Sequence, residues 1–163
     1  MSRLDSFLRR LQAQRDCLNH AVALVRGLPG AVFELGLGNG RTYDHLRENC
    51  RDREIFVFER AVRAHSDCIP DPEHLFEGPV DATLAAVRDR FAGRVALVHA
   101  DLGSGRADVD ARTAASISAA LPPLMAAGGI VVSDQELSLP GAEILALPAG
   151  VQPGRYFMYR FPG

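Results

Sequence analysis

The chain has 163 residues, of which 47% are apolar, and a formal net charge of −2. This length suits one domain with a substantial core, and the slightly acidic balance gives no electrostatic reason to bind nucleic acid or an anionic membrane. All 18 basic residues are arginines, which excludes a lysine base or Schiff base. Three cysteines without C-x-x-C spacing, and the lack of a signal peptide or a membrane-length apolar run, favour a cytoplasmic protein.

Residues 1–28 carry apolar side chains at three- and four-residue spacing, which predicts an amphipathic helix or two. The pattern weakens at residues 14–16, where we expect a break or bend. The apolar side chains near the start would not stay in water, so the segment should be a lid, a subunit contact of a homo-oligomer or a helix packed flat on a sheet. We therefore separate a helical segment, 1–28, from a main domain, 29–163.

The next stretch is an apolar run, Ala31 to Leu35, followed by glycines at 36, 38 and 40 and by a polar helix start at Arg41. This order indicates a strand, a tight turn and a helix. Alternating glycines let the backbone turn sharply and let a ligand approach it, and the helix offers free N–H groups to that ligand. We expect the site of the protein on this turn.

Side chains around the turn distinguish two classes of ligand. A dinucleotide turn needs a third glycine where this chain has Arg41, and Glu34 would repel a pyrophosphate but suits a ligand with an ammonium and a sulfonium. The pattern Glu-x-Gly-x-Gly-x-Gly, from Glu34 to Gly40, resembles motif I of the class I S-adenosylmethionine-dependent methyltransferases. The resemblance implies S-adenosyl-L-methionine as methyl donor and S-adenosyl-L-homocysteine as product.

A second apolar run ends in Glu59, close to the ~20-residue spacing after the glycines at which an acidic residue meets ribose hydroxyls. Residues 61–73 contain two prolines and predict a short second helix, followed by a brief third strand, 74–77. The family often holds the adenine amine with an acidic residue just beyond the next glycine. Pro79 stands at that place here, so Val80 or Asp81 would have to make the contact.

The rest of the chain alternates in the same way. The predicted segments are, in order, a fourth strand buried on both faces (94–102), an alanine-rich helix with a proline pair (111–127), a fifth strand (128–135) and two antiparallel strands (142–148 and 156–161). This alternation predicts an α/β fold. With the resemblance, which runs from about Leu28 to the C-terminus, it implies a three-layer αβα Rossmann-like methyltransferase sheet of seven strands, the last one antiparallel.

Catalytic candidates should lie at the carboxyl ends of the strands, where open α/β sheets place their ligands. Asp101, His99 and Asp134 satisfy this placement, although a lone histidine in a strand is more often a hydrogen-bonded core residue than a base. The resemblance implies cofactor contacts from Glu34, Gly36, Leu37, Gly38, Asn39, Gly40, Thr42, Glu59, Arg60, Gly78, Pro79, Val80 and Asp101. No metal is expected, because Asp134-Gln135 only partly matches the Asp-Asn of the metal-dependent catechol-like relatives.

The acceptor is expected to be a small molecule. Nucleic-acid aminomethyltransferases carry an Asn/Asp-Pro-Pro-aromatic signature after the fourth strand, and Ala100 to Gly103 does not match it. Two alternatives stay open: a non-catalytic cofactor-binding or oligomerisation module, suggested by the short region after the fifth strand, and a nicotinamide-dependent oxidoreductase.

Overall fold

The computed structural model describes residues 2–163, which form one seven-stranded sheet in the order β3-β2-β1-β4-β5-β7-β6. The strands are β1 (Ala31–Leu35), β2 (Ile55–Glu59), β3 (Leu75–Glu77), β4 (Val95–Ala100), β5 (Met125–Ser133), β6 (Glu143–Ile144) and β7 (Phe157–Arg160). The helices are α1 (Arg3–Leu24), α2 (Arg41–Asn49), α3 (Val80–Phe91) and α4 (Ala107–Ala120), with 3-10 turns η1 (Ser66–Cys68) and η2 (Pro72–His74). Strands β1 to β5 run parallel and β7 runs antiparallel to β5. The predicted architecture is confirmed.

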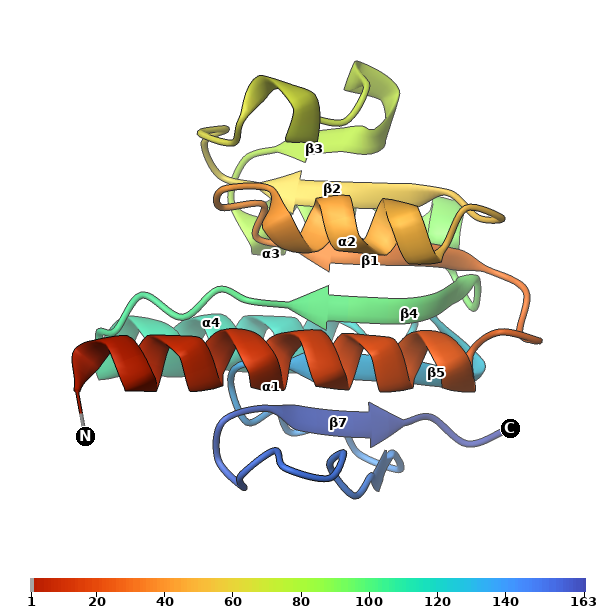
Figure 1. Cartoon of the computed structure of the whole chain (residues 1–163). Helices are drawn as coiled ribbons and strands as arrows, with labels where there is room; N and C mark the ends of the chain where they lie inside the picture. The colour runs from red at the N-terminus through yellow and green to blue at the C-terminus, as the bar shows by residue number, and fades with distance from the viewer. Residues whose placement is uncertain (1) are drawn as a thin grey trace.

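Two helical layers cover the sheet. Helices α1 and α2 lie on one face, and α3 and α4 lie on the other (Figure 1). Side chains alternate along each strand, so Val32 packs in the cluster that contains Leu18 of α1, whereas Phe33 packs in the cluster that contains Leu84 of α3. The sheet is therefore buried on both faces, which explains the nearly continuous apolar runs of its parallel strands.

The strand order reverses between β1 and β4. From β1 the chain continues to β2 and β3 on one side of the sheet. From β4 it continues to β5 on the other side, so the loops that follow β1 and β4 lead in opposite directions. Such a switch point opens a crevice at the carboxyl ends of the strands. Figure 1 shows α1 in front of β5 and beside β4, with its N-terminal part extending past the tip of β4.

Helix α1 corrects one expectation. It runs from Arg3 to Leu24 without a break at residues 14–16. Gln14 weakens the apolar pattern in the sequence, yet it is buried and its side-chain amide donates to Asp101 and to Tyr156. A polar residue inside the apolar stripe thus marks a buried contact with the sheet.

Two helical predictions were also wrong in extent. Residues 61–73 form the 3-10 turns η1 and η2 in place of a short α-helix. The alanine-rich helix ends at Ala120, and residues predicted to continue it enter β5 at Met125. Pro122 and Pro123 end the helix because proline lacks the amide hydrogen that the helical hydrogen-bond pattern needs.

Membrane crossing and disulfide bonding find no support in residues 2–163. No helix there is both long and apolar enough for a transmembrane span. Cys17 and Cys50 are buried free thiols, and Cys68 is a partly exposed one.

Candidate active site at the tips of β1 and β4

The glycine turn between β1 and α2 adopts backbone that favours glycine at three places. Gly36, Gly38 and Gly40 have φ angles of 92°, 51° and 84°. A Cβ on Gly36 would lie 2.5 Å from the carbonyl oxygen of Asp101, and one on Gly40 would overlap the side chain of Cys68. A Cβ on Gly38 would meet nothing within 4 Å. Packing therefore requires the outer two glycines, and the middle one leaves open space above the turn.

Glu59, at the end of β2, fixes the shape of this turn. Its Oε2 atom accepts hydrogen bonds from the backbone amides of Leu37 at 2.8 Å and Gly38 at 3.2 Å, and Oε1 accepts one from Ala61 at 3.0 Å. A carboxylate has about four lone-pair positions, so about one is left for a ligand. Asn39 and Arg60 are exposed beside this contact.

Below the turn lies a buried ion pair that joins β1 to β4. Glu34 and His99 face each other in register, both side chains are 0% exposed, and Glu34 Oε2 lies 2.7 Å from His99 Nδ1. The hydroxyl of Thr42, in the first turn of α2, donates to the other oxygen of Glu34. Burial opposes a charge on His99, but the charge and hydrogen bond of Glu34 outweigh it, so the pKa of His99 is raised.

The polar contacts continue from His99 towards α1. The hydroxyl of Tyr156 lies 3.5 Å from His99 Nε2, and it accepts a hydrogen bond from the amide of Gln14 at 2.8 Å. The same amide nitrogen donates to Asp101 Oδ2 at 2.7 Å, and the Arg10 guanidinium binds the two oxygens of Asp101 at 2.8 and 3.0 Å. One chain of side-chain contacts therefore runs from the start of α2 to the tip of β4.

Asp134, at the tip of β5, is the neighbour of Asp101. It accepts hydrogen bonds from the backbone amides of Leu102 at 3.3 Å and Gly103 at 3.0 Å. Burial and the nearby Asp101 carboxylate raise the pKa of Asp134. Two carboxyl groups thus lie together at the ends of β4 and β5, and the pKa of the Asp134 carboxyl is raised.

The predicted adenine side of the site lies at the end of β3. The backbone amide of Gly78 donates to the carbonyl oxygen of Glu59 at 2.9 Å, which places Gly78 beside the end of β2. Pro79 precedes the first turn of α3 and Val80 begins that helix. These residues lie, like Glu59, at the carboxyl ends of the parallel strands.

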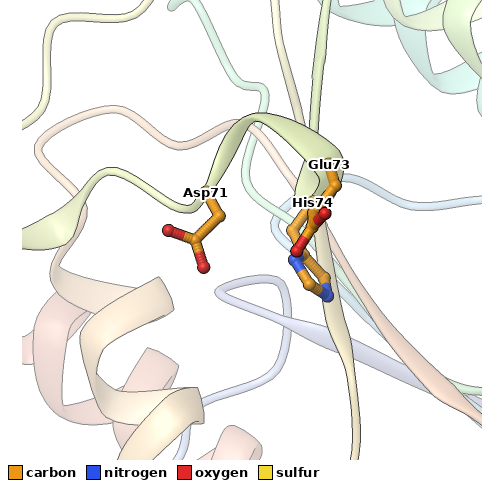
Figure 2. A group of neighbouring side chains, drawn as sticks. All are labelled: Asp71, Glu73 and His74. Carbon is orange, nitrogen blue, oxygen red and sulfur yellow. The ribbon is translucent and has the colours of Figure 1, made fainter.

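Potential metal ligands occur elsewhere. Among residues 2–163, the group of three such side chains is Asp71, Glu73 and His74, on η2 before β3. Figure 2 shows the three side chains on that short turn. His74 lies 3.5 Å from Glu54, which directly precedes β2. This group is therefore at the amino-terminal end of β2, whereas the glycine turn lies at the carboxyl end of β1. It brings no ligand to Asp101 or Asp134.

The predicted residues thus lie at the carboxyl ends of the parallel strands, but they differ in how far they are exposed to solvent. Gly38, Asn39 and Glu59 reach the surface, whereas Glu34 and His99 lie wholly inside. The direct ligand contacts assigned to Glu34 and His99 stay predictions, and their side-chain partners in the structure are other residues of the chain.

Sequence reasoning missed three residues of this arrangement: Arg10, Gln14 and Tyr156. Arg10 and Gln14 are four residues apart and therefore share one face of α1. The signal that could have found them is a polar pair of this spacing inside an apolar stripe. Tyr156 gave no such signal, because an aromatic residue at a strand start is ordinary.

Comparison with protein families gives a match over almost the whole chain. The family described as S-adenosyl-L-methionine methyltransferase matches residues 1–161. A search of the curated proteins found no match.

Solved structures agree with the family. An S-adenosyl-L-methionine methyl transferase from Silicibacter pomeroyi DSS-3 has 48% sequence identity and a TM-score of 0.93, covering 98% of each chain. The antibiotic-resistance methyltransferase Kmr (15% identity, TM-score 0.56, 91% of this chain and 93% of that one) shares the fold. So does a protein from Staphylococcus aureus assigned as a caffeoyl-CoA O-methyltransferase (12% identity, TM-score 0.56, 90% and 82%). The chain therefore belongs to the S-adenosyl-L-methionine methyltransferase family and is an enzyme that uses S-adenosyl-L-methionine as methyl donor.

Proposed function

We propose that the methyl acceptor is a small molecule bound at the tips of β4 and β5, beneath the first half of α1. The observation that carries this proposal is the position of Asp101, which lies beside Gly36 and is held from above by Arg10 and Gln14 of α1. A helix of the same chain covers this carboxylate, which disfavours a duplex or a folded protein as acceptor. The net charge of −2 also argues against a polyanionic acceptor.

The donor is proposed to lie across the glycine turn. Open space above Gly38 and the part-exposed carboxylate of Glu59 support this placement. The remaining predicted contacts form the rim: Gly36, Leu37, Asn39, Gly40, Thr42, Arg60, Gly78, Pro79, Val80 and Asp101. Glu34 would act from below, because its negative charge lies under the turn and its oxygen holds Thr42 in place.

The donor supplies an activated methyl group, whose bond to sulfur breaks as the bond to the acceptor forms. The chain has to align the acceptor with that methyl group and remove a proton where the acceptor carries one. Asp101 and Asp134 are the proposed groups for this task, since they lie together at the strand tips, where burial and the Asp101 carboxylate raise the pKa of Asp134 above its usual value. We assign His99 to positioning, because its two ring nitrogens face Glu34 and Tyr156.

A screen for release of S-adenosyl-L-homocysteine tests the acceptor class. The enzyme is incubated with donor and with pools of small metabolites, with transfer RNA or with unfolded peptides. We expect turnover with a small-molecule pool, and Asp101→Asn should lower the rate about 10²- to 10⁴-fold if Asp101 is the base. Asp89→Asn, an exposed carboxylate near the end of α3, is the control. Turnover with RNA or peptides alone would exclude the proposal.

We also propose that the enzyme works in the cytoplasm as a homo-oligomer through the first turns of α1. Leu4, Phe7 and Leu8 are 65%, 45% and 49% exposed in the single chain, although each would gain from burial. The triple substitution to Gln should lower the mass measured by light scattering, whereas Ile144→Gln, at a site 74% exposed on β6, should not. An unchanged mass in the triple variant would rule out this interface. Deletion is a poorer test, because the same helix carries Gln14 and buried core residues.

A further inference from the structure

A small cavity lies between α1 and the segment that leads into β7. It has a volume of about 270 Å³ and is lined by Arg9, Gln12, Ala13, Arg15, Asp16, Gly150, Val151, Gln152 and Arg155. Ligand pockets for whole drug-sized molecules usually measure about 300–1,000 Å³, so this one suits a single group such as a phosphate or a carboxylate.

The lining is rich in hydrogen-bond donors and positively charged. It contains three arginines and one aspartate. The aspartate, Asp16, is already held by Arg15, whose Nε and Nη2 atoms lie 3.1 and 3.0 Å from Asp16 Oδ1. Arg9 and Arg155 make no salt bridge with any residue in the described part of the chain. Two guanidinium groups without a salt bridge therefore border the same small space, and Asp5 lies near the one from Arg9.

Arg9 also carries donors for which residues 2–163 supply no acceptor. Its Nε and Nη2 atoms are buried and have no hydrogen-bond partner among residues 2–163. Buried donors are almost always paired, and a guanidinium can only donate, so the missing partner must be an acceptor. An oxyanion matches this need, because its paired oxygens fit the planar fork of arginine.

Along the chain, two residues of the cavity lining are next to residues that hold the proposed acceptor site together. Ala13 of the lining precedes Gln14, which holds Asp101, and Arg155 precedes Tyr156, which Gln14 also holds. We infer that this cavity binds a carboxylate or phosphate group, either one carried by the methyl acceptor or a free anion. That the group belongs to the methyl acceptor rests on the proposed function. Binding of an anion in the cavity does not.

Thermal unfolding in the presence of inorganic phosphate or succinate tests the cavity, with sodium chloride at equal ionic strength as reference. A ligand that binds only the folded state raises Tm in a saturable manner. We expect this rise in the wild type and in Arg3→Gln, an exposed arginine of the same helix outside the cavity. Arg9→Gln and Arg155→Gln should lose it. Because Arg9 Nε and Nη2 have no partner to lose, Arg9→Gln should fold normally.

Two results would overturn the inference. One is that neither anion raises Tm beyond the chloride reference. The other is that the rise persists in both Arg9→Gln and Arg155→Gln, since the anion would then bind elsewhere.

Kinetics distinguish the two sources once the screen described above has given an acceptor. If the acceptor carries the anionic group, phosphate competes with it, and Arg9→Gln raises KM at least tenfold while kcat changes little. If a free anion binds, phosphate raises Tm without competing. A screen that finds no small-molecule acceptor would defeat the proposed function and would leave the thermal result, for or against the cavity, intact.

Discussion

The two sides of the switch point are built in different ways. On the β1–β2 side, the site consists of one continuous turn whose backbone amides Glu59 holds, 22 and 21 residues along the chain from Leu37 and Gly38. On the β4–β5 side, Asp101 is held by Gln14, 87 residues away, and Gln14 reaches Tyr156 across 142 residues. The proposed donor side is thus a local motif, whereas the proposed acceptor side depends on how distant segments of the chain pack together.

The largest expected effect comes from breaking the ion pair that joins the two sides. Glu34→Leu leaves His99 buried without its partner, so the free energy of unfolding at pH 7 should fall by about 3–5 kcal/mol. Urea denaturation measures this loss. Glu54→Leu removes an exposed carboxylate before β2 and should cost far less, and the double variant Glu34→Leu, His99→Leu should recover part of the loss. If the Glu34→Leu variant were as stable as Glu54→Leu, the contact between Glu34 and His99 would not stabilise the pairing of β1 with β4.

The glycine turn offers a comparison within one side. Gly36→Ala forces a Cβ against the Asp101 carbonyl at positive φ, so it should destabilise the protein by about 1–3 kcal/mol or more and disturb both sides. Gly38→Ala has the strained φ but no clash, so its loss of stability should be smaller and its main effect should be weaker donor binding. Thermal unfolding and calorimetry with S-adenosyl-L-homocysteine separate the two variants. Equal losses of stability would contradict this assignment.

Glu59→Ala should act on the donor side alone. It removes the acceptor of the Leu37 and Gly38 amides and the proposed ribose contact, so affinity for S-adenosyl-L-homocysteine should fall by about 1–3 kcal/mol, or roughly 5- to 150-fold. Calorimetry measures this change. Glu54→Ala, at the other end of the same strand, is the matched control and should bind normally. Wild-type affinity in Glu59→Ala would remove Glu59 from the donor site.

The smallest expected effect is a slope with pH. The pKa of His99 is raised above its unfolded value of 6.5 by Glu34 despite burial, so its contribution to stability is complete below about pH 6.5 and is lost as pH rises through the folded pKa. The stability of the wild type minus that of His99→Gln, measured by urea denaturation from about pH 5.5 to 9, should therefore decline with rising pH. A difference that grows with pH would mean that His99 is neutral in the folded protein.

How much the sequence could predict follows the same division. The glycine turn and Glu59 were found because their spacing along the chain reflects a local geometry, and the strands were found because burial on both faces leaves them apolar. The Glu34 contact with His99 was not anticipated, since register between strands, not spacing, brings the two together. The α1 contacts were missed for the same reason. A polar Gln14 suggests a break in the helix as long as its partners Asp101 and Tyr156, which are distant in the sequence, are not known.

The helix that covers the acceptor side also imposes an order on biosynthesis. Helix α1 leaves the ribosome well before one of its partners, because Tyr156 follows Gln14 by 142 residues. At about 5–20 residues per second, this delay is roughly 7–28 s. Cys17, Leu18 and Ala21 pack in a cluster whose strand residues extend from Val32 in β1 to Met158 in β7, so this cluster is complete only after that delay. The proposed acceptor side therefore cannot be complete until Tyr156 has been synthesised.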